Sequence, residues 1–396
     1  MELDLGLKRL SNVTRLLPAV TAVNAAEERR RLAGCLARGV AADPAWRWKP
    51  QELGASPWRW LATCRDLALD SPARESYLRR LDELELDLEL LAVLGHPARV
   101  RPLAARRFGS GRSPVPSDEG PVPLARVAAA LLAHVQDTSE PRTLPADAPD
   151  SSVPSVARLM RAVAAAAGLE VRVAVEPRLA AAAAAGERIV LLADRRFGWR
   201  EAVRLAVHEV LGHLVSAANG RAQPLRIVEL GMAGSFADQE GLCIFLEEMA
   251  GVLCGHRLRT LAARVVVADL MHDGVPFGEA ARVLVDEHGF EPFEAVTLAE
   301  RAYRGGGVAR DVSYLGGWLR VRRAVVAGEA TVDELRSGRV SLAELPALRV
   351  LAAEGRVRPP AYRPSLSRSL RATHCGTSFH GSPPRVAASF TRFEAT

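Results

Sequence analysis

The sequence is poor in several features that would point to particular classes of protein. Only two of its 52 basic residues are lysines, and aromatic residues occupy 5% of the 396 positions. Proteins that bind nucleic-acid strands interleave basic residues with aromatic rings on which the bases stack. The net charge of +6 therefore does not predict a nucleic-acid partner. Together with alanine runs such as 180–185, it reflects a compositional bias toward Arg and Ala.

Cysteines and long apolar segments are also scarce. The five cysteines are scattered without a CxxC pair, which favours a reducing compartment over a disulfide-bonded secreted protein. The first twenty residues contain no uninterrupted apolar core before a small-residue cleavage site, so they predict no signal peptide. No run reaches the roughly 18 uncharged apolar residues of a membrane-spanning helix. We expect a cytoplasmic protein without a membrane partner.

The spacing of apolar residues predicts a mainly helical chain that contains a small sheet. Leu and Ala recur at helical spacing over 1–108, although the segment "LELDLEL" (84–90) alternates with period two and also allows a strand. Alternating apolar residues predict strands in 169–177 and 187–194, separated by a short helical or loop segment. Further helices follow to about residue 354.

Segments rich in Pro, Ser and Gly divide the chain, and the candidate boundary is the stretch 137–155. The last residues are rich in Pro, Ser and Arg and have the composition of a disordered tail, where we do not expect a metal site. The predicted regions are a helical N-terminal region (1–150), a catalytic region that carries the motifs described below (151–365) and the tail (366–396). The tail residues of metal-ligating type are His374, Cys375 and His380.

One predicted helix, "RLAVHEVLGHLVSAANG" (204–220), carries an H-E-x-x-x-H pattern. On a regular helix His208 and His213 lie about 140° apart and cannot bind one metal ion together. A π-bulge would absorb the additional residue, and Gly212 supplies the backbone freedom. Either the helix is distorted and holds a metal, or His208 is a core histidine and Glu209 belongs to a surface ion pair.

A hydrolytic zinc site needs a third protein ligand and an open position for water. Glu240 is predicted in the first turn of an apolar helix, where an unpaired buried carboxylate is unfavourable and a metal would satisfy it. Glu247 shares that helix face and is the alternative ligand, whereas Glu248 is predicted to be solvated or ion-paired.

Four blocks occur in the order and approximate spacing of one protein family: "HEVLGH", "NGRAQPL", "DQEGL" and "RAYRGGGVARDVSYLGG". On these blocks the sequence resembles the microtubule-associated tyrosine carboxypeptidase family, whose bacterial members are often labelled flavohemoglobin expression-modulating QEGLA-motif proteins. The resemblance runs from about residue 150 to 365, and a fainter likeness covers 91–111.

The resemblance implies a zinc metallopeptidase that removes the C-terminal residue of a peptide or protein, with a preference for an aromatic residue (Tyr or Phe). It implies zinc ligands at His208, His213 and Glu240 and a catalytic base at Glu209. We expect a predominantly helical α+β, zincin-like fold, in which a small sheet packs on the active-site helix. Because the Ala and Arg bias points to a bacterial source, tubulin is not the expected partner.

The sequence departs from the family's pattern at three positions. Gly212 stands where many members have Thr, Cys243 replaces the Ala of the QEGLA block, and Arg310 replaces an expected Lys. Cys243 is one turn from Glu240, so its thiol could be an inhibitory or redox-sensitive ligand. The alternative is a small buried packing residue.

Other residues of these blocks suggest supporting roles. Tyr314 is predicted to donate a hydrogen bond to the oxyanion, and Arg304 or Arg301 to bind the substrate carboxylate beside the glycine run. A flexible loop with solvated arginines is the alternative. Asn219 and Gly220 are predicted to end the site helix in a left-handed cap.

Two functions from other classes are kept as alternatives. One is a catalytically silent zinc-binding regulatory module, although the presence of Glu209 argues against it, since a structural zinc needs no base. The other is a nucleic-acid binder that acts through the arginines of the tail, which a steep salt dependence would reveal.

Overall fold

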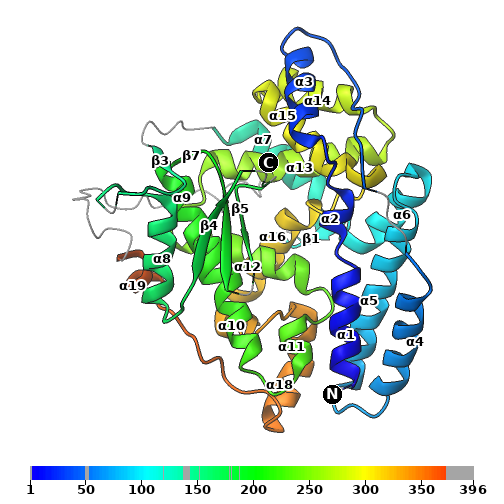
Figure 1. Ribbon diagram of the computed structural model, residues 1–396, viewed down its shortest axis with the longest axis vertical. Helices are drawn as coiled ribbons and strands as arrows, with labels where there is room; N and C mark the ends of the chain where they lie inside the picture. Colours follow the sequence, from blue (N-terminus) through cyan, green and yellow to red (C-terminus); the bar gives the residue numbers. More distant parts are fainter. Residues whose placement is uncertain are drawn as a thin grey trace. The chain divides into compact units, whose positions relative to one another are not determined.

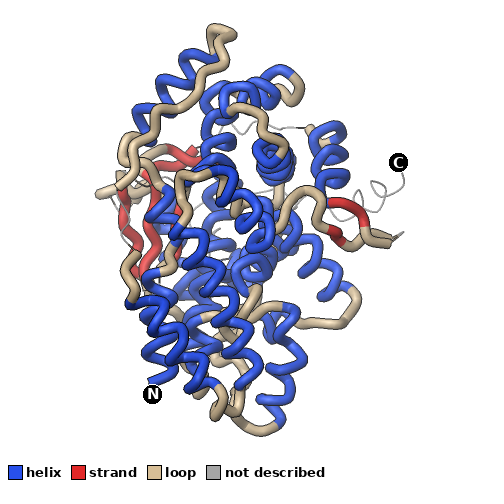
Figure 2. Tube along the Cα trace, turned by 90° about the vertical axis from the view of Figure 1, so that its right-hand side faces the viewer, coloured by secondary structure: helices blue, strands red, loops and turns tan. Residues whose placement is uncertain are grey.

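A computed structural model of the protein is drawn in Figure 1. It describes residues 2–49, 53–118, 120–136, 143–150, 152–177, 179, 181–186 and 188–371. These residues form an α+β structure in which helices predominate, as predicted from the sequence (Figure 2). In the described ranges, no helix combines the length and the apolar character needed to cross a membrane. The tail residues His374, Cys375 and His380 lie outside the described residues.

The chain divides into two compact units, and neither is continuous in sequence. Unit 1 comprises residues 1–136 and 257–316, and unit 2 comprises residues 137–256 and 317–396. Two of the boundaries fall inside helices, which are α13 (Gly255–His272) and α16 (Val312–Val326). The three-region division inferred from composition stays a prediction.

Unit 1 is built mainly from helices. Its further elements are α1 (Glu2–Val13), α2 (Leu16–Val20), α3 (Ala25–Leu36), α4 (Ser56–Ala68), α5 (Arg74–Ala92), α6 (Pro97–Phe108), β1 (Pro114–Val115), β2 (Val122–Pro123), α7 (Leu124–His134), α14 (Phe277–Asp286), α15 (Pro292–Tyr303) and the 3-10 turn η2 (Arg304–Gly306). Helices α1 and α4 pack with α5, and α15 packs with α3 and α14.

The ambiguous segment 84–90 is helical and lies within α5. Leu81, Leu84 and Leu88 recur at the spacing of one helix face, and all three are fully buried. The apolar stripe therefore continues through the segment, and its burial decides in favour of the helix. A neighbouring cluster joins Leu90 of this helix to Val308 and to residues of α2 and α6.

Unit 2 contains all strands except β1 and β2 among the described residues. Its further elements are β3 (Thr143–Pro145), α8 (Val156–Ala166), β4 (Arg172–Glu176), β5 (Ala183–Ala185), β6 (Ile189–Ala193), β7 (Arg196–Gly198), α9 (Trp199–Leu205), the π-helix η1 (Ala206–Leu214), α10 (Val215–Arg221), α11 (Arg226–Leu230), α12 (Ser235–Met249), α17 (Val332–Leu335), η3 (Leu342–Glu344), α18 (Leu345–Ala353) and α19 (Leu366–Arg371). The remainder of the predicted tail, 372–396, lies outside the described residues.

The three-stranded sheet of unit 2 has the order β4-β6-β5. Both predicted strands are confirmed, and β4 and β6 pair in parallel with Val173 opposite Val190. The expectation of only helix or loop between them is wrong, because Ala183–Ala185 form β5, antiparallel to β6. Alanine is depleted in strands, so pairing with β6 rather than local propensity decides this conformation.

The helices α9, η1 and α10 follow one another without a break from Trp199 to Arg221. The central segment, η1, packs against α8, α12 and the edge strand β5. Its apolar side chains are almost completely buried, with Val210 at 0% and Leu211 at 1% exposure. The motif helix is therefore the centre of the unit 2 core, and the sheet lies against it.

The predicted left-handed cap at Asn219 and Gly220 is wrong, because both residues lie within α10 and the helix continues to Arg221. The Asn219 side chain instead donates to the carbonyl oxygens of Arg336 and Tyr362 and accepts from the Tyr362 N–H. A Cβ atom on Gly220 would lie 2.9 Å from the Glu229 Cα atom. Asn219 thus binds chain segments that are distant in the sequence, and Gly220 allows the backbone at Glu229 to approach α10 closely.

Two glycines let α12 and α16 pack with their backbones in contact. A Cβ atom on Gly241 would lie 2.3 Å from the carbonyl group of Gly317, and one on Gly317 would lie 2.1 Å from the Ala237 carbonyl oxygen. Real Cβ contacts are not this short, so neither position accepts a side chain unless the helices move apart.

Gly241→Ala should therefore lower the free energy of unfolding by about 1–3 kcal/mol, because the added methyl group forces two backbones apart. The measurement is urea unfolding followed by circular dichroism. Gly34→Ala in α3 is the matched control, since only the flexible tip of Arg38 lies near that position, at 3.6 Å. Equal stability of the two variants would contradict the close contact.

Candidate metal centre

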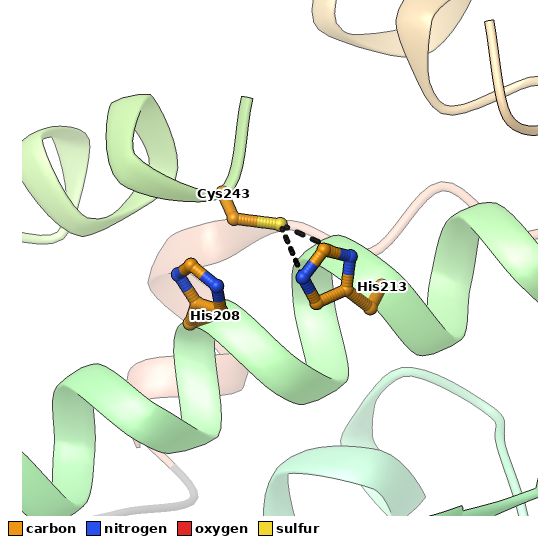
Figure 3. A group of neighbouring side chains, drawn as sticks. All are labelled: His208, His213 and Cys243. Atoms are coloured by element: carbon orange, nitrogen blue, oxygen red, sulfur yellow. Dashed lines mark hydrogen bonds between the residues drawn. The ribbon is translucent and has the colours of Figure 1, made fainter. Parts of the chain in front are cut away.

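The helical run through unit 2 changes its pitch where the predicted ligands lie. Ala206–Leu214 form a π-helix, in which each turn takes up more residues than an α-helical turn. His208 and His213, five residues apart, consequently project from the same side of the helix toward α12, with ring centroids 5.0 Å apart (Figure 3). The distortion predicted from their spacing is confirmed.

Glu240 brings a carboxylate to the two rings from α12. Its Oε2 atom lies 3.3 Å from Nε2 of His208 and 3.7 Å from Nε2 of His213. This oxygen is buried and has no hydrogen-bond partner among the described residues. The sequence predicted Glu240 in the first turn of its helix. This is wrong, because α12 begins at Ser235 and Glu240 therefore lies in the second turn. A cation between these three atoms would satisfy the oxygen.

The charges of these groups depend on one another. Burial alone would lower the pKa of His208, but its contacts with Glu240 and Glu247 outweigh burial and raise the pKa to about 9. Burial alone would raise the pKa of Glu240, but the charge of His213 and the contact with His208 hold it well below its usual range. A metal ion binds the neutral imidazole, so a cation bound at this site would displace the His208 proton.

Glu247, the alternative ligand, contacts His208 from the opposite side of the ring. Its fully buried Oε1 atom lies 2.7 Å from Nδ1 of His208. A carboxylate accepts hydrogen bonds, so Nδ1 keeps its proton when His208 becomes neutral, and Nε2, which faces Glu240, is then the nitrogen with a lone pair. Glu247 is thus placed to fix the orientation of the His208 ring.

Arg204, which sequence reasoning missed, adds a positive charge to this side of the site. Its Nη1 atom lies 3.5 Å from Oε1 of Glu247. The residue precedes His208 by four positions on the same helical run, so the spacing of charged residues could have revealed it. Arg204 thus places a positive charge beside the buried Glu247 carboxylate.

Cys243 approaches the other histidine. Its Sγ atom lies 3.6 Å from Nδ1 and 3.7 Å from Nε2 of His213 (Figure 3). One ligand atom each from His208, His213 and Cys243 lie within 4.8 Å of one another. A Cβ atom on Gly212 would lie only 2.3 Å from Sγ, so the glycine leaves the space that the sulfur occupies. Two donor sets therefore share the histidines, one completed by Glu240 and one by Cys243.

Glu209, the predicted base, lies next to His208 on η1 and is 6% exposed. None of the described residues donates a hydrogen bond to its carboxylate. Its lone pairs are therefore available to accept a proton from another molecule.

The remaining predicted site residues, Tyr314, Arg301 and Arg304, belong to unit 1. Arg301 pairs with Asp311 through its Nε atom, and the buried Arg304 donates to Oε1 of Glu300 at 3.1 and 3.2 Å. The Tyr314 ring lies 5.1 Å from the Arg264 guanidinium carbon. Their roles toward a substrate stay predictions.

The family model of the microtubule-associated tyrosine carboxypeptidases matches residues 57–381. The chain belongs to this family. Membership in this carboxypeptidase family implies an activity of carboxypeptidase type. The match begins in α4, so it includes much of the helical N-terminal region in addition to the blocks noted in the sequence. No curated protein matches the chain.

The contact between Glu247 and His208 generates a test. Glu247→Gln removes the negative charge behind the ring and should lower the affinity for Zn²⁺ by about 10–100-fold, as for other partners of ligating histidines. Competition with a chromophoric chelator measures this affinity.

Glu248→Gln is the matched control on the same helix, because the Glu248 carboxylate binds Trp318 and Arg322 instead of a histidine. Its metal affinity should equal that of the wild type. An equal loss in both variants would mean that a loosened α12, and not the orientation of His208, explains the effect.

Proposed function

We propose that the protein is a zinc-dependent carboxypeptidase that hydrolyses the last peptide bond of a peptide or protein. The buried Glu240 Oε2 atom, which faces two imidazole nitrogens without a hydrogen-bond partner, carries the proposal. Family membership supports the position of the cleaved bond, and the family's name supports release of an aromatic residue such as tyrosine.

The donor set fits zinc, which takes imidazole nitrogen and carboxylate oxygen in catalytic sites with three protein ligands. His208, His213 and Glu240 would hold the ion. When bound, zinc supplies a Lewis acid that polarises the peptide carbonyl and lowers the pKa of water. Glu247 would fix the His208 ring in the ligating tautomer.

Glu209 acts as the general base in this proposal. Its carboxylate takes a proton from the attacking water and then delivers it to the leaving amine, so that one group serves both steps. Tyr314 is the proposed hydrogen-bond donor to the oxyanion, and Arg301 and Arg304 are the proposed partners of the substrate carboxylate.

The surroundings of η1 support a zincin-like arrangement. The helix that carries the histidines packs against β5, an edge strand of the small sheet. An extended substrate could add to this edge and so align its backbone beside the motif helix.

Among the described residues, no cysteine is in a disulfide, which supports our proposal of a reducing, cytoplasmic setting.

The decisive experiment incubates zinc-loaded protein with a peptide library that varies in its C-terminal residue, followed by mass spectrometry. We expect loss of one C-terminal residue, fastest for Tyr and Phe. Glu209→Gln should lower kcat by about 10²–10⁴-fold, because the amide cannot take the proton, while the zinc content stays at one ion per chain.

Internal cleavage, or cleavage at the same rate by Glu209→Gln, would contradict the mechanism. The control for nonspecific loss of charge is Glu229→Gln, whose carboxylate pairs with Arg226 on α11 and is not adjacent to a proposed ligand. This variant should cleave as the wild type does.

The position of Cys243 favours a second function, a catalytically silent zinc-binding regulatory module. Structural zinc sites are closed by four protein ligands, and a sulfur 3.6 Å from His213 is near enough to suggest a fourth. In that case the wild type would bind zinc without cleaving any peptide of the library.

Cys243→Ala separates the two functions. If Cys243 is a packing residue, the variant cleaves peptides as the wild type does, and we expect this outcome. The Co²⁺-substituted wild type should then lack the near-ultraviolet sulfur-to-cobalt charge-transfer band. An inactive wild type that shows this band, together with an active variant that does not, would establish Cys243 as an inhibitory ligand.

A further inference from the structure

Arg264 is a buried cation whose hydrogen bonds are incomplete. It lies on α13 between the buried residues Ala263 and Val265, and its side chain is 11% exposed. Its Nε and Nη1 atoms are buried and have no hydrogen-bond partner among the described residues. Unsatisfied guanidinium donors of this kind call for an acceptor that the described part of the chain does not supply.

The nearby carboxylate of Asp311 is shared. Its Oδ2 atom lies 3.8 Å from Nη1 of Arg264, beyond hydrogen-bonding distance, and already accepts from Nε of Arg301. Two guanidinium groups thus face one buried carboxylate. The Glu300 carboxylate does not correct this balance, because it is engaged by Arg304 at 3.1 Å and by Arg29 at 2.7 Å.

The electrostatics of the cluster agree with an excess of positive charge. Burial, followed by the charge of Arg301, lowers the pKa of Arg264 to about 9. Burial alone would raise the pKa of Asp311, but Arg301 and Arg264 hold it below its usual range, so the carboxyl group is fully ionised. An uncompensated buried charge is unfavourable, and an added anion would relieve it.

Tyr314 holds the guanidinium in place from one side. Its ring centroid lies 5.1 Å from the Arg264 guanidinium carbon, within the range of a cation–π contact. A guanidinium fixed by a ring face keeps its N–H fork in one orientation, which is the geometry that binds a carboxylate through two hydrogen bonds.

We propose that Arg264 and Arg301 form an oxyanion-binding site in unit 1, and that its ligand is the free carboxylate of a peptide C-terminus. The identity of this ligand rests on the proposed function, whereas the site itself does not. Arg264 then takes the place beside Arg301 that the proposed function gave to Arg304, whose guanidinium donates to Glu300. A phosphate ion has the same hydrogen-bonding chemistry and is the other source that the experiment must distinguish.

Thermal unfolding of the full-length protein at constant ionic strength tests the site. The background is Glu209→Gln, and the probes are N-acetyl-tyrosine, N-acetyl-tyrosine amide and inorganic phosphate. We expect N-acetyl-tyrosine to raise Tm by about 2–4 °C near saturation, because a ligand that binds only the folded chain stabilises it. The amide lacks the carboxylate and should leave Tm unchanged.

Arg264→Met keeps an apolar stem without the charge, so it should abolish the shift. Arg112→Met is the matched control in the same unit, because that side chain is 87% exposed. Without any probe, Arg264→Met should unfold at a temperature no lower than the wild type, since an uncompensated charge has been removed.

If only phosphate raises Tm and Arg264→Met abolishes this increase, the site is supported, but its ligand is phosphate and not a peptide carboxylate. Equal shifts in Arg264→Met, or no shift with any probe, would overturn the site. A clearly lower Tm of Arg264→Met without probe would also overturn it, because Arg264 would then be a structural partner of Asp311.

The two proposals fail in different ways. If the proposed function is wrong, wild-type protein cleaves no peptide, but phosphate still shifts Tm in an Arg264-dependent manner. If the anion site is wrong, the wild type still cleaves peptides, and Arg264→Met cleaves them with the same KM as the wild type.

Discussion

The candidate site depends on the pitch of one helix. Five residues separate His208 from His213, and only the wider turn of η1 brings both rings to one side. A π-turn is less favourable than an α-turn, so the surrounding structure must hold it. Burial of η1 against α8, α12 and β5 provides this support. The ligand geometry is therefore a property of the whole core of unit 2 and not of the motif alone.

Features that follow from local spacing could be predicted from the sequence. The distortion at Gly212 follows from the number of residues between the histidines, and the strands β4 and β6 follow from alternating apolar residues. The helix α5 was ambiguous over a few residues, but its apolar stripe on both sides pointed to the correct structure. Glu240 could be chosen because a carboxylate in an apolar helix needs a partner.

Features that depend on distant contacts could not be predicted in this way. The strand β5 consists of alanines, whose conformation is decided by pairing with β6. Asn219 and Gln223 resemble loop residues in the sequence, yet they bind backbone groups of Tyr362 and Arg358, more than 130 positions later. The missing hydrogen bonds of Arg264 follow from a contact between other residues, because the Asp311 carboxylate accepts from Arg301 instead.

The discontinuity of the two units has a consequence for synthesis at the ribosome. Unit 1 lacks α14 and α15 until Tyr303 has been made, although its first 136 residues emerge before any of unit 2. The motif helix and α12 leave the ribosome in that interval, before the later segments of either unit exist. Both units are thus incomplete at the same time during translation, and the apolar surfaces of α1 to α7 must stay unaggregated until their partners arrive.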